Sequence, residues 1–111
     1  MRMSVSRIAI AALAVSFNAH ASGNAEAGKA KAAQVCAACH GPEGSKPSAP
    51  DQPVLAGQHY DYLVKALSDY KSGRRSNPIM KGFAGQLSKQ DIQDLAAWFS
   101  SQTSTPLHNQ R

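Results

Sequence analysis

The stretch Cys36-Ala37-Ala38-Cys39-His40 contains the only two cysteines of the chain, and a histidine directly follows the second. If this segment ends a helix, Cys36, Cys39 and His40 stand at positions i, i+3 and i+4 and share one face. Two thiols on that face can add to two vinyl groups along one edge of a porphyrin, and His40 can then lie beneath the iron. The C-x-x-C-H spacing therefore predicts covalent attachment of one haem c.

Three other interpretations of the cysteine pair remain open. A redox-active disulfide would resemble thioredoxin-like motifs, but those follow a strand of a βαβ unit, and the sequence shows no such strand. A structural zinc site needs four Cys or His ligands, and His20, His59 and His108 are isolated from one another. Two buried, inert cysteines would leave His40 unexplained. Haem attachment is favoured because it accounts for both cysteines and the histidine.

The N-terminus is typical of a secretory signal peptide. Arg2 and Arg7 precede an apolar run from Ile8 to Phe17, and Ala19-His20-Ala21 follows it. A short positive region, an apolar core and an A-x-A end are the parts of such a peptide. The run is too short to span a bilayer as an ordinary helix, and a buried N-terminal helix would have no polar face. We expect cleavage after Ala21 and a periplasmic protein without a stable membrane anchor.

The charge of the chain gives no sign of a nucleic-acid partner. The sequence has 12 Lys and Arg against 7 Asp and Glu. Removal of the leader takes away two arginines, and the acid groups of a haem offset more of the excess. No dense basic run is present. Residues 22–111 are enough for one domain, and a chain this short often depends on a cofactor for stability.

The apolar pattern predicts an all-helical domain. A first helix is expected from about residue 24 to residue 38, with Asn24 as its N-cap. A second helix fits residues 59–72, where apolar residues recur at helical spacing and Gly73 stands directly after the end. Both helices are bounded by residue types that begin or end helices.

The remaining segments alternate between loop and helix. Residues 41–53 are dense in Gly, Pro and Ser and are expected to form a loop. Residues 74–86 are expected to be irregular, with one short turn near Met80. A third helix begins after Ser88, which can act as its N-cap, with Asp91 at the N3 position.

An iron bound at His40 needs a second axial ligand. Met1 and Met3 leave with the signal peptide, so Met80 is the only methionine of residues 22–111. A lone methionine usually fills a core, but Met80 follows Pro78, which can stiffen the approach of its thioether to the iron. Met80 is the expected ligand, and His59 is the alternative.

Together these motifs resemble class I bacterial cytochromes c. The chain is similar to the small cytochromes c553 and c5 and to one half of the dihaem cytochrome c4, from Gly28 to about Phe99. The segments that carry the resemblance are Cys36 to Gly41, Pro53 to Gln58, Tyr62-Leu63, Asn77 to Met80, and Leu87 to Phe99.

The resemblance implies a small monohaem fold of three to four helices around one covalently bound haem. Cys36 and Cys39 would form the thioethers, and His40 and Met80 would be the axial ligands of the iron. The carbonyl of Pro53 would accept a hydrogen bond from the ring of His40 and so fix its orientation. The implied organisation is a signal peptide over residues 1–21, a cytochrome c domain over residues 22–102 and a polar C-terminal tail over residues 103–111.

The resemblance also suggests how the rest of the domain is used. The first and last helices would cross closely, with Gly28 and Ala32 as a small surface beneath Leu95 and Trp98. The residues that could reach the haem propionates are Tyr62, Arg74 and Arg75.

The implied function is transfer of single electrons, not enzymatic catalysis. Both axial positions of the iron would be filled, and the chain supplies no constellation of acid, base and nucleophile. The implied partners are redox proteins, namely a membrane cytochrome complex and an oxidase or reductase, and the protein would be a monomer or weak dimer. Electrons are expected to leave through a haem edge near the cysteines. The alternative is a tightly bound haem subunit of a periplasmic oxidoreductase complex.

Overall fold

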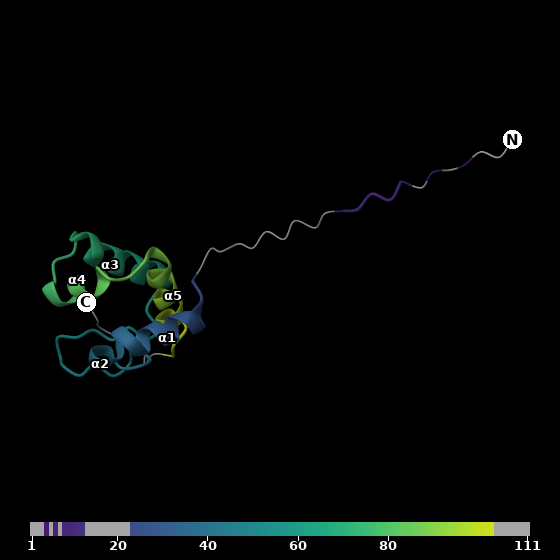
Figure 1. Cartoon of the computed structure of the whole chain (residues 1–111). Helices are drawn as coiled ribbons and strands as arrows, with labels where there is room; N and C mark the ends of the chain where they lie inside the picture. Colours follow the sequence, from purple (N-terminus) through teal and green to yellow (C-terminus); the bar gives the residue numbers. More distant parts are fainter. Residues whose placement is uncertain (1–3, 5, 7, 13–22, 104–111) are drawn as a thin grey trace.

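The computed structural model describes residues 4, 6, 8–12 and 23–103. Within this part of the chain the regular structure is entirely helical (Figure 1), which confirms the all-α fold class. The helices are α1 (Ala25–Val35), α2 (Ala37–His40), α3 (Tyr60–Ser72), α4 (Pro78–Ala84) and α5 (Lys89–Ser100). None of them is long and apolar enough to cross a membrane. The expected cleavage point after Ala21, and the tail beyond residue 103, lie outside the described residues.

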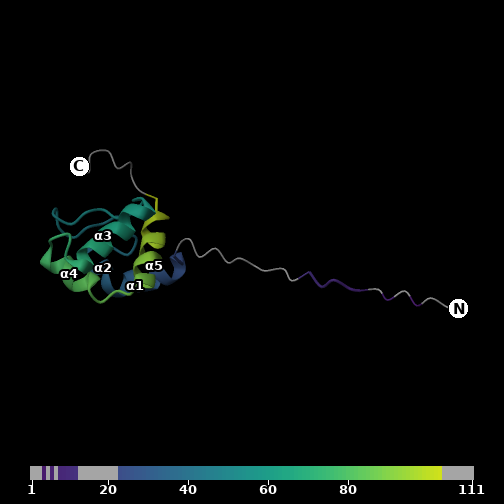
Figure 2. The same cartoon turned by 90° about the horizontal axis from the view of Figure 1, so that it is seen from above.

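The closest helix pair is α1 with α5, and Figures 1 and 2 show the two side by side. The backbones approach because α1 carries a glycine at the contact. A Cβ on Gly28 would lie 1.9 Å from the carbonyl oxygen of Asp94 and 2.9 Å from the Cβ of Trp98. Ala32, one turn further along α1, is fully buried. The predicted small surface on the first helix is therefore present.

Among the described residues, one apolar core joins α1, α3 and α5. Leu95 and Phe99 are its largest fully buried side chains, and each stabilises the fold by about 1.5–3 kcal/mol through removal of apolar surface from water. The helix α5 contributes residues at i, i+3, i+4 and i+7, which is one helical face. The buried core residues are Ala32, Leu63, Leu87, Ile92, Leu95, Ala96 and Phe99.

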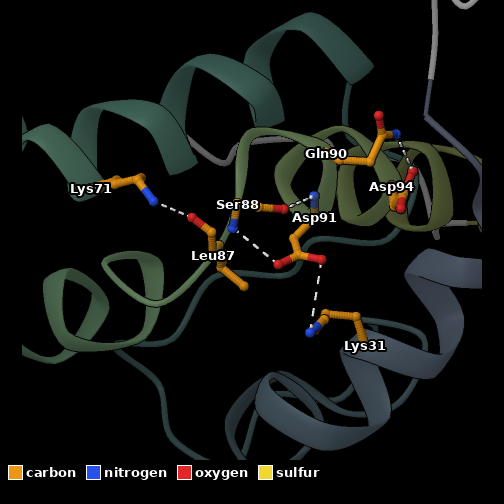
Figure 3. Close-up of polar contacts among 7 residues, drawn as sticks. All are labelled: Lys31, Lys71, Leu87, Ser88, Gln90, Asp91 and Asp94. Carbon is orange, nitrogen blue, oxygen red and sulfur yellow. Dashed lines mark hydrogen bonds and ion pairs between the residues drawn. The ribbon is translucent and has the colours of Figure 1, made fainter.

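The start of α5 is fixed by a capping box, as the sequence predicted (Figure 3). The N–H of Asp91 donates to the Ser88 hydroxyl at 2.9 Å, and the N–H of Ser88 donates to the Asp91 carboxylate at 2.9 Å. The ammonium of Lys31 on α1 lies 3.7 Å from the same carboxylate. The backbone hydrogen bond from Ser88, with help from Lys31, lowers the pKa of Asp91. The cap therefore also ties α5 to α1.

A second set of polar contacts anchors the start of α1 to the middle of α5. The backbone N–H of Asn24 donates to the Asp94 carboxylate at 2.8 Å, and the Asn24 side chain caps α1 by accepting from Ala27 at 3.0 Å. Asp94 is buried and also accepts from the Gln90 amide at 2.8 Å (Figure 3). A buried carboxylate is thus satisfied by two donors, which offsets the cost of removing it from water.

The first predicted helix is in fact two helices. The segment 24–38 was expected to be continuous, but α1 ends at Val35 and α2 begins at Ala37. Cys36 lies between them with φ −114° and ψ −32°, and its N–H still donates to Ala32 at 2.9 Å. The φ of −114° at Cys36 departs from the helical value of about −63°. The regular helix is therefore interrupted there, and a separate short turn carries the cysteine pair.

The expectation of an irregular stretch over residues 74–86 is also corrected, because residues 78–84 form α4. The side chain of Asn77 accepts from the N–H groups of Ile79 and Met80, each at 3.1 Å. Pro78 takes the first helical position, where its missing N–H costs nothing. The two additional short helices bring the described total to five, against the three to four expected.

The second predicted helix agrees with α3 to within one residue. It begins at Tyr60 after His59, which is extended, and Gly73 follows its end with a left-handed φ of 85°. The ammonium of Lys71, near the end of α3, donates to the carbonyl of Leu87 (Figure 3). This bond connects the end of α3 to the segment between α4 and α5.

The contact at Gly28 can be tested by a pair of glycine substitutions. Gly28→Ala should lower the free energy of unfolding by about 1–3 kcal/mol or more, because its Cβ would meet the Asp94 backbone. Gly82→Ala is the matched control, since a Cβ there has nothing within 4 Å, and it should stabilise by about 0.5–1 kcal/mol. Urea unfolding followed by circular dichroism measures both. Equal changes in the two variants would contradict the close contact.

Candidate functional site

A cavity of about 760 Å³ opens between two sides of the domain. In Figure 1, α3 and α4 form one side, and α2 with the loop after it forms the other. The cavity brings together the residues that the sequence singled out from separate segments, namely Cys36, Cys39, His40, Pro53 and Met80.

Local backbone geometry explains how the C-x-x-C-H segment presents its side chains. The N–H of His40 donates to the carbonyl of Cys36 at 3.0 Å, and the N–H of Cys39 donates to the same carbonyl at 3.3 Å. The segment is therefore one helical turn, and the two cysteines and the histidine fall on one face. Gly41 ends the turn with φ 82°, a conformation that side chains rarely adopt.

The ring of His40 is buried and held in one orientation. It is 7% exposed, and its Nδ1 donates to the carbonyl of Pro53 at 2.9 Å. Because a carbonyl can only accept, Nδ1 carries a proton in this bond, and in the neutral ring the lone pair is on Nε2. The ring has the tautomer that a metal ligand requires.

The loop after α2 places Pro53 against His40. The carbonyl of Gly44 accepts from the N–H groups of Leu55 and Ala56, at 2.8 Å and 3.2 Å. The N–H of Ser48 donates to the carbonyl of Cys39 at 2.9 Å. These bonds fold the Gly- and Pro-rich segment back over the helical turn that carries the two cysteines.

Both cysteines are half-buried, and no disulfide joins them. Burial raises the pKa of Cys36 to about 11, and the nearby charge of Cys39 acts in the same direction. Before haem is attached, the Cys36 thiol is therefore protonated at neutral pH. Among the described residues, no three His, Cys, Asp or Glu side chains form a metal-binding group, so the zinc alternative lacks a ligand set there.

Met80 lies in the first turn of α4, half-buried, and lines the same cavity as His40. The cap on Asn77 fixes its backbone. His59, the alternative ligand, is exposed at the start of α3 and is not among the residues that line the cavity. His108 lies outside the described residues.

The structure separates the two arginines that the sequence grouped together. Arg75 lines the cavity, donates to the Tyr62 hydroxyl at 3.3 Å and lies 4.8 Å from the ring centre of Tyr70. The hydrogen bond to Tyr62 is the main reason that the pKa of Arg75 is raised. The ion pairs of the described residues do not include Arg75. Arg74 is exposed and does not line the cavity.

Sequence reasoning missed several apolar walls of the cavity. Ile79 and Phe83 flank Met80 at helical spacing, a signal that was hidden because α4 was not expected. The sequence predicted the apolar face of α3 but did not show that this face lines the cavity. The apolar residues that line the cavity include Val35, Leu55, Leu63, Leu67, Ala84, Leu87, Leu95 and Phe99.

These residues fit a covalently attached haem. The cavity volume lies within the range of cofactor sites, roughly 300–1,000 Å³. Two thiols, one imidazole nitrogen and one thioether are available, and the surrounding walls are apolar. Arg75 adds a cation at the cavity wall, where it can meet an acid group.

Residues 25–103 match the family described as Cytochrome c. Cytochrome c4 of Pseudomonas aeruginosa is 54% identical over 84 residues, which cover 76% of this chain and 41% of that protein. Cytochrome c-554(548) of Halomonas halodenitrificans is 41% identical over 83 residues, which cover 72% of this chain and 98% of that protein.

A solved structure shows the same relationship. The crystal structure of reduced recombinant cytochrome c4 from Pseudomonas stutzeri superposes with a TM-score of 0.68 at 44% sequence identity. The match covers 75% of this chain and 47% of that one. The chain therefore spans about half the length of the cytochrome c4 relatives that it matches.

Proposed function

This chain belongs to the cytochrome c family, and we propose that it is a periplasmic carrier of single electrons with one haem c held between His40 and Met80. Membership confirms the resemblance to one half of cytochrome c4. Proteins of this family bind haem c covalently and transfer electrons, and the single domain fits one haem. The observation that carries the residue assignments is the cavity that both cysteines, His40 and Met80 line together.

Four side chains would hold the haem. Cys36 and Cys39 would bind its edge through thioethers. The lone pair on Nε2 of His40, oriented by the bond from Nδ1 to Pro53, would be one axial ligand, and the Met80 thioether the second. The iron supplies Fe(II)/Fe(III) chemistry, and a His/Met ligand pair favours the reduced form relative to two histidines. Apolar walls exclude water, so the surroundings reorganise little when the charge changes.

The ligand assignment is tested by two substitutions. Met80→Ala should abolish the weak far-red absorption band that methionine gives to ferric haem c and should lower the reduction potential, while the haem stays attached. His59→Gln is the control and should leave both properties unchanged. Optical spectra and a redox titration of the purified proteins measure the outcome. Retention of the band in Met80→Ala, or its loss in His59→Gln, would contradict the assignment.

We propose that Arg75 meets an acid group of the bound haem, because it lines the cavity and takes part in no ion pair of the described residues. Arg75→Gln removes a cation near the iron, which favours the more positive oxidised state. The reduction potential should fall by on the order of 1 kcal/mol, or tens of millivolts. Arg74→Gln is the matched control and should change it much less. Equal shifts in both variants would indicate only general surface charge.

Location and free diffusion can be tested together on the native protein. The proposal of a cleaved leader is supported by the sequence, and by Ile8 and Ile10, whose side chains are 85% and 88% exposed. Protein released by osmotic shock should begin at Ser22 and elute from gel filtration as a monomer or weak dimer. Retention of the leader would contradict export. Elution with a large oxidoreductase would favour the alternative, a tightly bound haem subunit.

A further inference from the structure

The last turns of α5 contact both ends of the irregular loop that follows α2. At the start of the loop, the indole Nε1–H of Trp98 donates to the carbonyl of Pro42 at 3.0 Å. At its end, the N–H of Gly57 donates to the carbonyl of Phe99 at 2.9 Å. Two consecutive residues of one helix therefore hold the loop at both ends. This is the loop that supplies the carbonyl bonded to the ring of His40.

The side chain of Trp98 is itself held against α1. The ammonium of Lys29 lies 5.5 Å from the centre of the indole ring, within the range of a cation–π contact. A Cβ placed on Gly28 would lie 2.9 Å from the Cβ of Trp98, so α1 leaves the base of this side chain little room to move. The ring is half-buried, and its one polar atom is the donor to the loop. The packing of α1 on α5 thus gives the indole N–H a fixed position.

A short series of contacts connects Pro42 to Pro53 within the loop. Gly44 follows Pro42 by two residues, and its carbonyl accepts from the N–H of Leu55 at 2.8 Å. A Cβ on Gly44 would lie 2.8 Å from Cδ1 of Phe99, so this part of the loop lies directly on α5. Pro53 precedes Leu55 by two residues. The position of the Pro53 carbonyl therefore depends on how the loop is held against α5.

We propose that Trp98 is a positioning residue for the His40 ligand. Its indole N–H holds the loop, the loop places the Pro53 carbonyl, and that carbonyl fixes the ring of His40. This role rests on the proposed function, in which His40 is an axial ligand, and deepens it by naming the residue that orients that ligand. Trp98 is not among the residues that line the cavity. It acts on the iron only through the loop, because a bond from the imidazole to a carbonyl raises the basicity of the ligand.

A merely structural role of Trp98 makes a different prediction. Loss of the indole N–H should raise the equilibrium constant for unfolding by roughly two- to tenfold in either case, which is the ratio for one hydrogen bond. Properties of the folded protein separate the two roles. A structural role leaves the His40 ring and the iron of the folded protein unchanged, whereas a positioning role changes both.

The test removes the indole N–H without a change of shape. Trp98 is the single tryptophan of the chain, so production in a tryptophan auxotroph supplied with benzothienylalanine alters this position alone and puts sulfur in place of the N–H. 5-Fluorotryptophan is the matched control, since it keeps the N–H. Trp98→Phe is a genetically encoded variant that also lacks the donor, and it should change the folded protein in the same direction as benzothienylalanine.

The first measurement is the NMR signal of the His40 Nδ1–H in the reduced holoprotein. With benzothienylalanine this proton should move upfield, because its bond to the Pro53 carbonyl becomes weaker. With 5-fluorotryptophan it should stay where it is in the wild type.

The second measurement is the reduction potential of the same proteins. A less basic imidazole stabilises the oxidised iron less, so the potential should rise with benzothienylalanine and not with 5-fluorotryptophan.

The assignment requires both changes. An unchanged His40 signal or potential with benzothienylalanine would overturn it, and lower stability alone would then be the effect of Trp98. Equal changes with 5-fluorotryptophan would overturn it as well, because that analogue keeps the donor. A wild type without attached haem, or with an iron that His40 does not ligate, would overturn the proposed function instead.

Discussion

The close approach of α1 and α5 at Gly28 is the contact on which the rest of the domain depends. Because a Cβ would lie 1.9 Å from the Asp94 carbonyl, only glycine allows the two backbones to meet. The bond from Asn24 to Asp94 and the ion pair from Lys31 to Asp91 hold the same pair of helices along their length. The C-terminal end of α1 is thereby fixed over the core, and it delivers Cys36 to the cavity.

The loop after α2 converts that position into a defined site. Its hydrogen bonds to Gly44 and Cys39 fold an irregular segment over the cysteine turn, and the carbonyl of Pro53 meets the ring of His40. A buried imidazole has two nitrogens to satisfy. Here Nδ1 donates its proton to the carbonyl of Pro53, and in the neutral ring Nε2 retains a lone pair. The orientation of the His40 ring therefore depends on the conformation of the loop and not on the histidine alone.

The elements predicted from the sequence were those with strong local signals. Ser88 and Asp91 form the capping box that their spacing predicted, and Gly73 ends α3 in a left-handed conformation. The helix α4 was missed because Asn77-Pro78 was interpreted as loop, although Asn as an N-cap and Pro at the first position also begin helices. The break at Cys36 has no residue-type signal, since it depends on how the turn packs. The different positions of Arg74 and Arg75 likewise require the tertiary structure.

The cavity and the core are not separate parts of this small domain. Leu63, Leu87, Leu95 and Phe99 belong to the buried core and also line the cavity. A group that binds there completes the same apolar layer that holds α3 and α5 together, so its binding free energy adds to the stability of the folded state. A chain of this length buries only a modest apolar core of its own. Stability and the binding of haem are therefore coupled through these side chains, and a substitution in the core should disturb the cavity even without contact to the proposed ligands.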